Sequence, residues 1–165
     1  MARQRVLGLD PGTAIVGWGV VEAEGQDMTL LDYGTIRTPA KRPLAERVTQ
    51  IYDQLNELLD RYPPDGVAIE QLFFARNVTT ALPVAHARGV MLLAAHKRGI
   101  PLQEFKPVEI KKALTGYGKA DKRQMQQMVR LLLGLNDIPR PDDAADAIAA
   151  AICYHQTARY SRLIK

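Results

Sequence analysis

Two kinds of hydrophobic spacing alternate along this chain and predict a layered α/β domain. Short apolar or alternating runs bounded by turn residues predict strands over residues 5–10, 15–21, 29–37, 67–70 and 102–105. Apolar positions three and four residues apart predict helices, one opened by Pro43 and others over about 79–98, 108–114, 121–133 and 142–159. Three meandering strands, followed by helices that alternate with strands, predict a mixed five-stranded sheet flanked by helices.

Single residues indicate where two helices begin, and the absence of repeats indicates the extent of the domain. Thr79 or Thr80 can cap the second helix, and Asp121 is a suitable N-cap for the fourth. The chain shows no internal repeat or linker, so we expect one domain over residues 1–165, with a flexible tail from about residue 158.

Carboxylates end two of the predicted strands. Asp10 follows the apolar run 6–9, and Glu70 follows the run 67–69. Burying a charge there is costly unless something compensates it. Ligands of open α/β sheets bind at the carboxyl ends of strands, so the two acids are neighbours if their strands are adjacent and parallel. Each also has an ordinary explanation, since Asp10 can open an Asp-Pro-Gly turn and Glu70 can point into solvent.

The last helix adds further acids near its start. Asp143 and Asp146 are three residues apart and share a helix face, and Asp142, four residues before Asp146, lies on that face too. Asp142 is a natural N-cap, so one acid can cap the helix while the others bind metal, and this alternative stays open at this point. Asp146 is the sharper signal because it interrupts an apolar face. Acids from three segments predict one site for a divalent cation, and oxygen ligands favour magnesium or manganese over zinc.

Charge is unevenly distributed in a chain whose net charge is +4. Residues 97–130 hold nine Lys or Arg side chains against three acids, so a polyanion is a natural partner, although a basic run is also typical of a solvated surface. Two metal ions bracketing one phosphate would need no side-chain nucleophile. Cys153, the single cysteine, is expected to be a small packed hydrophobe. No apolar run approaches a membrane span or a signal-peptide core, so we expect a cytoplasmic protein.

Three motifs in order resemble the RuvC family of Holliday-junction resolvases. They are residues 7–13 (LGLDPGT), 69–73 (IEQLF) and 143–147 (DAADA), with further likeness at 86–90 (HARGV) and 110–112 (IKK). The resemblance implies a ribonuclease H-like fold. It also implies a homodimer that cuts four-way DNA junctions symmetrically by magnesium-dependent hydrolysis, in homologous recombination and DNA repair. A branch-migration motor is the implied partner complex.

The same resemblance assigns residue roles. It implies that Asp10, Glu70, Asp143 and Asp146 are the catalytic, metal-binding acids, which selects Asp143 over Asp142. It places a base-stacking phenylalanine at Phe73, DNA-facing lysines at Lys111 and Lys122, and the dimer helix at roughly 82–96. From the residues themselves, an aromatic pair in a loop beside Glu70 is suited to stacking on an unpaired base. We therefore expect DNA contacts from Phe73, Phe74, Arg76, Asn77 and Lys119 as well.

Three other functions compete with a resolvase. The run 8–13 resembles the phosphate loop of actin-like kinases and ATPases, but those proteins need two such domains. A ribonuclease H-like nuclease acting on RNA–DNA hybrid is a closer rival, and Phe73 and the apolar second helix argue against it. A junction-binding module without chemistry is disfavoured, because four uncompensated carboxylates would repel DNA.

Overall fold

The computed structural model describes residues 2–71 and 78–164, which form five strands and five helices. The strands are β1 (Gln4–Asp10), β2 (Ile15–Glu24), β3 (Asp27–Arg37), β4 (Gly66–Glu70) and β5 (Leu102–Phe105). The helices are α1 (Leu44–Arg61), α2 (Val78–Lys97), α3 (Pro107–Thr115), α4 (Lys122–Leu132) and α5 (Asp142–Leu163). None of the helices in this part of the chain is long and apolar enough to cross a membrane.

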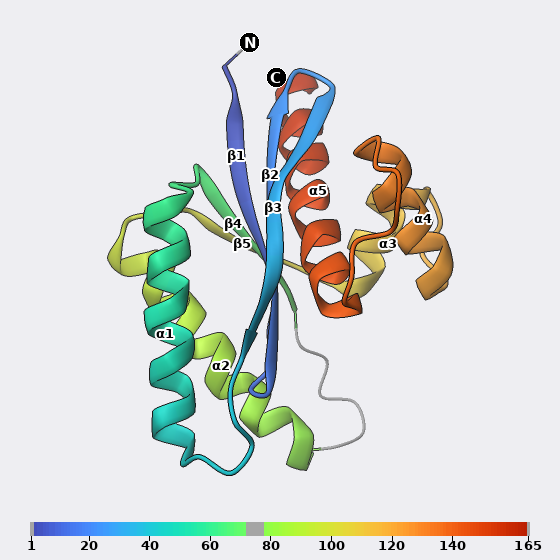
Figure 1. Cartoon of the computed structure of the whole chain (residues 1–165). Helices are drawn as coiled ribbons and strands as arrows, with labels where there is room; N and C mark the ends of the chain where they lie inside the picture. The colour runs from blue at the N-terminus through green and yellow to red at the C-terminus, as the bar shows by residue number, and fades with distance from the viewer. Residues whose placement is uncertain (1, 72–77, 165) are drawn as a thin grey trace.

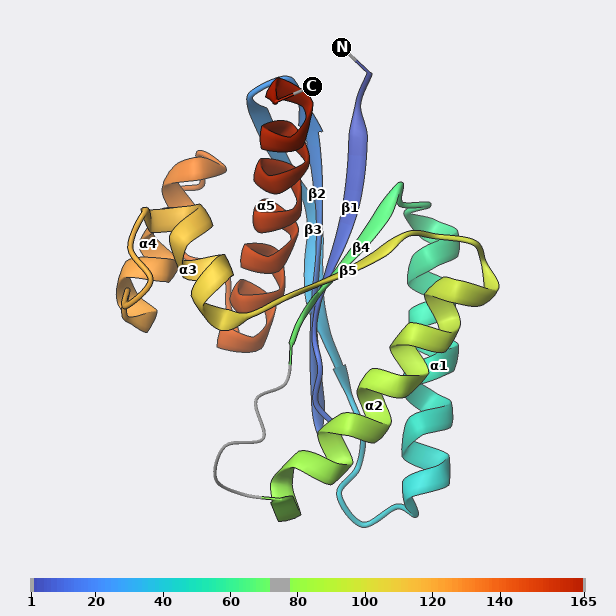
Figure 2. The same cartoon turned by 180° about the vertical axis from the view of Figure 1, so that it is seen from behind.

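The strands form one mixed sheet in the order β3-β2-β1-β4-β5. Strand β1 lies at its centre, antiparallel to β2 and parallel to β4. Helices α1 and α2 cover one face of the sheet, and α5, flanked by α3 and α4, covers the other (Figures 1 and 2). The predicted mixed five-stranded sheet flanked by helices is therefore confirmed.

The β2–β3 hairpin is longer than its apolar pattern indicated. Pairing continues to Glu24 opposite Asp27, around a tight turn in which Gly25 has φ 67°. A positive φ suits glycine and closes a two-residue hairpin turn, so backbone pairing extends through residues too polar to look like strand.

Two predicted helix caps fail and one holds. Helix α2 already begins at Val78, so Thr79 and Thr80 are helical residues and cannot be its N-cap. Helix α5 has Pro141 as its N-cap, without a side-chain cap bond, so Asp142 is not the cap either. Asp121 does cap α4, because its Oδ1 accepts a hydrogen bond of 2.8 Å from the backbone N–H of Gln124.

The central strand divides its side chains between two cores. Leu7 and Leu9 pack into the core beneath α1 and α2, together with Ile51 and Met91. Val6 belongs to the core on the α5 side. This alternation follows from the two-residue period of a strand, and it puts Gly8 and Asp10 on the α5 face with Val6.

Glycines let α5 lie directly on the sheet. A Cβ at Gly8 would overlap the carbonyl oxygen of Ala147, and one at Gly17 would overlap that of Asp143. The absent side chains therefore permit a close approach of helix backbone to strand backbone, and this approach fixes the height of the start of α5 over the sheet.

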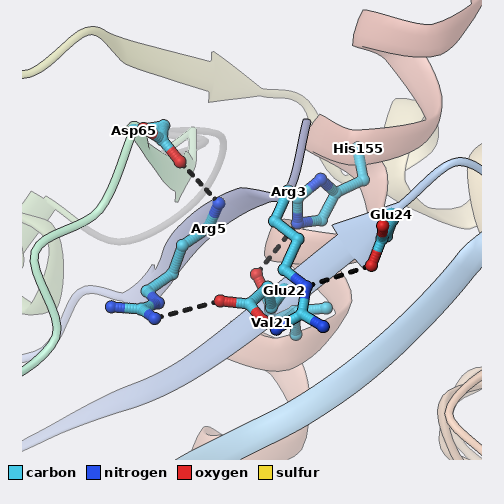
Figure 3. A network of polar contacts seen from close by, with 7 residues as sticks. All are labelled: Arg3, Arg5, Val21, Glu22, Glu24, Asp65 and His155. Atoms are coloured by element: carbon cyan, nitrogen blue, oxygen red, sulfur yellow. Dashed lines mark hydrogen bonds and ion pairs between the residues drawn. The ribbon is translucent and has the colours of Figure 1, made fainter. Parts of the chain in front are cut away.

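Polar contacts fix the opposite end of β1 (Figure 3). The backbone N–H of Arg5 donates to Asp65 at 2.7 Å, and its guanidinium donates to Glu22 at 3.0 Å. The side chain of His155 is 7% exposed, and its Nε2 lies 2.9 Å from the carbonyl oxygen of Val21. Cys153 is fully buried, as predicted.

Candidate active site

Asp10 and Glu70 end neighbouring parallel strands. Leu9 pairs with Ile69 in the β1–β4 register. Asp10 and Glu70 are the next residues of these two strands, so they lie side by side. Both lie on the α5 face, because Asp10 continues the Val6–Gly8 side of β1 and Glu70 continues the Ala68 side of β4. The predicted adjacency of these two carboxylates is confirmed.

Helix α5 brings two further acids to the same strand ends. The backbone of Asp143 lies against Gly17, the residue paired with Asp10 across β1 and β2. Asp146 follows one helical turn later and is half-buried among alanines that are themselves fully packed. The close approach at Gly17 therefore determines where the acids of α5 stand relative to Asp10.

The carboxylates influence one another strongly. Burial raises the pKa of Asp10 to about 8, and the charges of Asp146, Glu70 and Asp143 contribute to that rise. Burial also raises the pKa of Glu70, with the charge of Asp146 as the second cause. For Asp146, burial again raises the pKa, while the Lys122 ammonium acts against it. Asp10 thus stays largely protonated at neutral pH until a cation compensates its charge.

A cleft of about 260 Å³ opens beside these acids. Glu70 and Asp146 line this cleft together with Lys111 of α3, Lys122 of α4 and the α4 cap Asp121. The positive charge of Lys111 partly offsets the rise in the pKa of Glu70, and that of Lys122 partly offsets the rises for Asp10 and Asp146. Both ammonium groups therefore act on the acids. An acidic centre with two cations at its rim is suited to a phosphodiester bound through metal ions.

Asp142 has a role of its own, apart from the four clustered acids. Its Oδ2 lies 2.9 Å from Nζ of Lys122, and its Oδ1 accepts a 2.9 Å hydrogen bond from Nε2 of Gln126. Sequence reasoning left Asp142 open and missed Gln126. The available signal was the spacing of Lys122 and Gln126, four residues apart on one helix face.

Of the remaining predicted contact residues, the structure describes only Lys119. Lys119 is exposed on the loop between α3 and α4 and does not line the cleft. Phe73, Phe74, Arg76 and Asn77 lie outside the described residues. Their predicted contacts with DNA stay predictions.

Comparison with known proteins decides the family. The family model described as crossover junction endodeoxyribonuclease RuvC matches residues 6–154. The chain is 57% identical over 154 residues to the crossover junction endodeoxyribonuclease RuvC of Chloroflexus aggregans, covering 93% of this chain and 94% of that protein. The chain belongs to the RuvC family.

Other RuvC proteins extend the likeness to structure. The Thermomicrobium roseum RuvC is 54% identical over 159 residues, which cover 96% of this chain and 97% of that protein. A structure of Thermus thermophilus RuvC in complex with a Holliday junction substrate matches with a TM-score of 0.92 and 38% identity, over 96% of each chain. The predicted RuvC membership and ribonuclease H-like fold are confirmed.

Proposed function

We propose that this RuvC-family chain resolves four-way DNA junctions by paired, symmetric hydrolysis of phosphodiester bonds. The observation that carries the proposal is the convergence of four acids at the ends of β1 and β4 and the start of α5, beside a cleft bearing Lys111 and Lys122. Family membership supports an endonuclease, and the Thermus thermophilus relative has been seen with a Holliday junction substrate.

The chemistry of the acids fits divalent cations. All four offer oxygen ligands, which Mg²⁺ and Mn²⁺ prefer, and burial beside three other acids disfavours the charged form of Asp10 unless a cation compensates it. Across residues 2–71 and 78–164, no three His, Cys, Asp or Glu side chains stand at the spacing that one ion requires. The four acids therefore lie near one another, but their side chains are not arranged at metal-ligand distances. We propose that Asp10, Glu70, Asp143 and Asp146 hold magnesium, two ions in each site, with manganese as a substitute.

Bound metal would supply Lewis-acid stabilisation of the reacting phosphate and a more acidic attacking water. Lys111 and Lys122, which line the same cleft as Glu70 and Asp146, would bind the phosphate oxygens. A covalent enzyme intermediate through Cys153 is unsuitable, since this thiol is fully buried and burial raises its pKa to about 12. Water is accordingly the nucleophile in this proposal.

DNA contacts beyond the cleft are proposed from the sequence. Phe73 or Phe74 would stack on a junction base, and Arg76, Asn77 and Lys119 would bind phosphates. The position of residues 73–77 along the chain supports their part of this proposal, because this segment closely follows Glu70.

A second copy of the chain is the proposed protein partner. Leu82 and Leu93 of α2 are 53% and 51% exposed, although Met91 and Ala94 of the same helix are buried in the core. Eleven residues make three helical turns, so both leucines lie on one outward stripe. This stripe supports a homodimer through residues 82–96. From the family resemblance we further propose that the dimer acts in the cytoplasm together with a branch-migration motor.

The proposed role of the acids is tested by separating binding from cutting. Asp10→Asn should bind a four-way junction with the affinity of the unaltered protein, yet cut it at least about 100-fold more slowly with Mg²⁺. Asp137→Asn, which alters an exposed acid of the α4–α5 loop, is the matched control and should cut normally. Normal cutting by Asp10→Asn would contradict the proposal.

A further inference from the structure

Asp142 joins two helices at the rim of the acid cluster. Lys122 and Gln126 lie one turn apart on α4, and both contact the carboxylate of Asp142, at the first residue of α5. Each carboxylate oxygen therefore has a partner on α4. Asp142 is bound as a bridge between helices, whereas Asp143 and Asp146 interact with the strand-end acid Asp10.

The ammonium that Asp142 holds also has two acids of the cluster close by. The negative charges of Asp146 and Asp143 act on Lys122 together with that of Asp142. A lysine side chain is long and flexible, so an untethered Lys122 would turn toward these clustered carboxylates. There it would occupy oxygens that a divalent cation needs.

We infer that Asp142 is a positioning residue that keeps Lys122 at the rim, leaving the acid cluster to the metal and the ammonium to a DNA phosphate. The inference rests on the proposed metal-dependent function. Because the side chains of Lys122 and Asp142 are 58% and 46% exposed, their ion pair contributes little to the stability of the fold. Its loss should therefore change cation binding without unfolding the protein.

A double-mutant cycle on Mn²⁺ binding tests this inference. Mn²⁺ affinity is measured on full-length protein without DNA, by the paramagnetic resonance signal of the free ion, for the unaltered chain, Asp142→Ala, Lys122→Ala and the double variant. We expect Asp142→Ala to weaken Mn²⁺ binding about three- to tenfold, and to have no effect when Lys122 is already alanine. Thermal unfolding should be the same for all four proteins.

The cycle distinguishes an effect that Asp142 exerts through Lys122 from a direct effect of its negative charge on the bound cation. If Asp142 acted only through its negative charge, its removal would weaken Mn²⁺ binding equally in both backgrounds, and the inference would be overturned. An unchanged affinity in Asp142→Ala would overturn it too. Asp137→Ala removes the same charge from the exposed α4–α5 loop and should leave Mn²⁺ affinity unchanged.

Cleavage gives a second, independent readout. At saturating Mg²⁺ and junction DNA, Asp142→Ala should lower kcat about three- to tenfold with an unchanged dissociation constant for the junction, and Asp142→Glu should recover part of the rate. An unchanged kcat would contradict the positioning of Lys122 toward phosphate. If the unaltered protein cut no junction at all, the proposed function would fail while the Mn²⁺ cycle could still be interpreted.

Discussion

Asp10 carries the main electrostatic cost of the site. Its pKa of about 8, raised first by burial and then by three neighbouring acids, means that the folded protein binds a proton which the unfolded chain releases near pH 4. The stability contribution of this group is therefore complete at low pH and is lost as pH rises through about 8. A bound cation would offset the same cost.

Asp10→Asn should consequently stabilise the metal-free protein at alkaline pH. With a chelator present, we expect its free energy of unfolding at about pH 9 to exceed that of the unaltered protein by on the order of 2 kcal/mol, and the difference to vanish near pH 4. Thermal and urea unfolding at both pH values measure it, with Asp137→Asn as the control. Destabilisation at about pH 9 would mean that Asp10 is chiefly structural.

Added Mg²⁺ should stabilise the unaltered protein but not a variant that lacks one of the four acids. A cation that binds the folded site stabilises it by mass action, by about 2.7 kcal/mol at one hundred times the dissociation constant. We expect Mg²⁺ to raise the Tm of the unaltered protein and to leave that of Asp146→Asn nearly unchanged. Equal rises in both proteins would place the ion elsewhere.

Among the elements, α5 and β1 set the geometry of the site. Strand register determines that Asp10 and Glu70 are neighbours, and the contact of α5 with Gly8 and Gly17 determines how near Asp143 and Asp146 stand. A shift of α5 away from the sheet would separate the acids even if every acid were retained.

Gly8→Ala tests this dependence. The added methyl group would overlap the backbone of Ala147, which cannot move without α5, so we expect a loss of about 3 kcal/mol in stability and a lower Tm. Cleavage should fall as well. Gly118→Ala is the control, because its methyl group would meet only side-chain atoms of Val108 and Lys112, which can shift. Equal effects of both variants would contradict the proposed role of Gly8.

The periodic elements and the adjacency of the strand-end acids were predictable from the sequence, but the contacts between side chains of different helices were not. Strand-end acids such as Asp10 and Glu70 are conspicuous because a charge ends an apolar run. The ion pair between Asp142 and Lys122 depends instead on how α4 packs against α5. The spacing of residues along one helix does not specify that packing. Gly8 and Gly17 likewise resemble ordinary strand residues until the backbone of α5 lies over them.

For the whole molecule, symmetric cutting requires two active sites and hence two copies. The exposed leucines of α2 support the proposed dimer, since two large apolar side chains on one outward stripe are suited to an interface.

Leu93→Glu should therefore weaken the dimer. A charge at the centre of an apolar interface is expected to raise the dimer dissociation constant at least about tenfold, as measured by sedimentation equilibrium. Leu131→Glu, at a leucine of α4 that is 59% exposed, should leave the association unchanged. A Leu93→Glu protein that dimerises normally would place the interface elsewhere.

The most direct test of the central claim is cleavage of an end-labelled mobile four-way junction with Mg²⁺, beside linear duplex and RNA–DNA hybrid. We predict paired nicks at symmetric positions in the junction, and no cutting of the duplex or the hybrid. Cutting of the hybrid, or binding of the junction without any nick, would contradict the proposed resolvase activity.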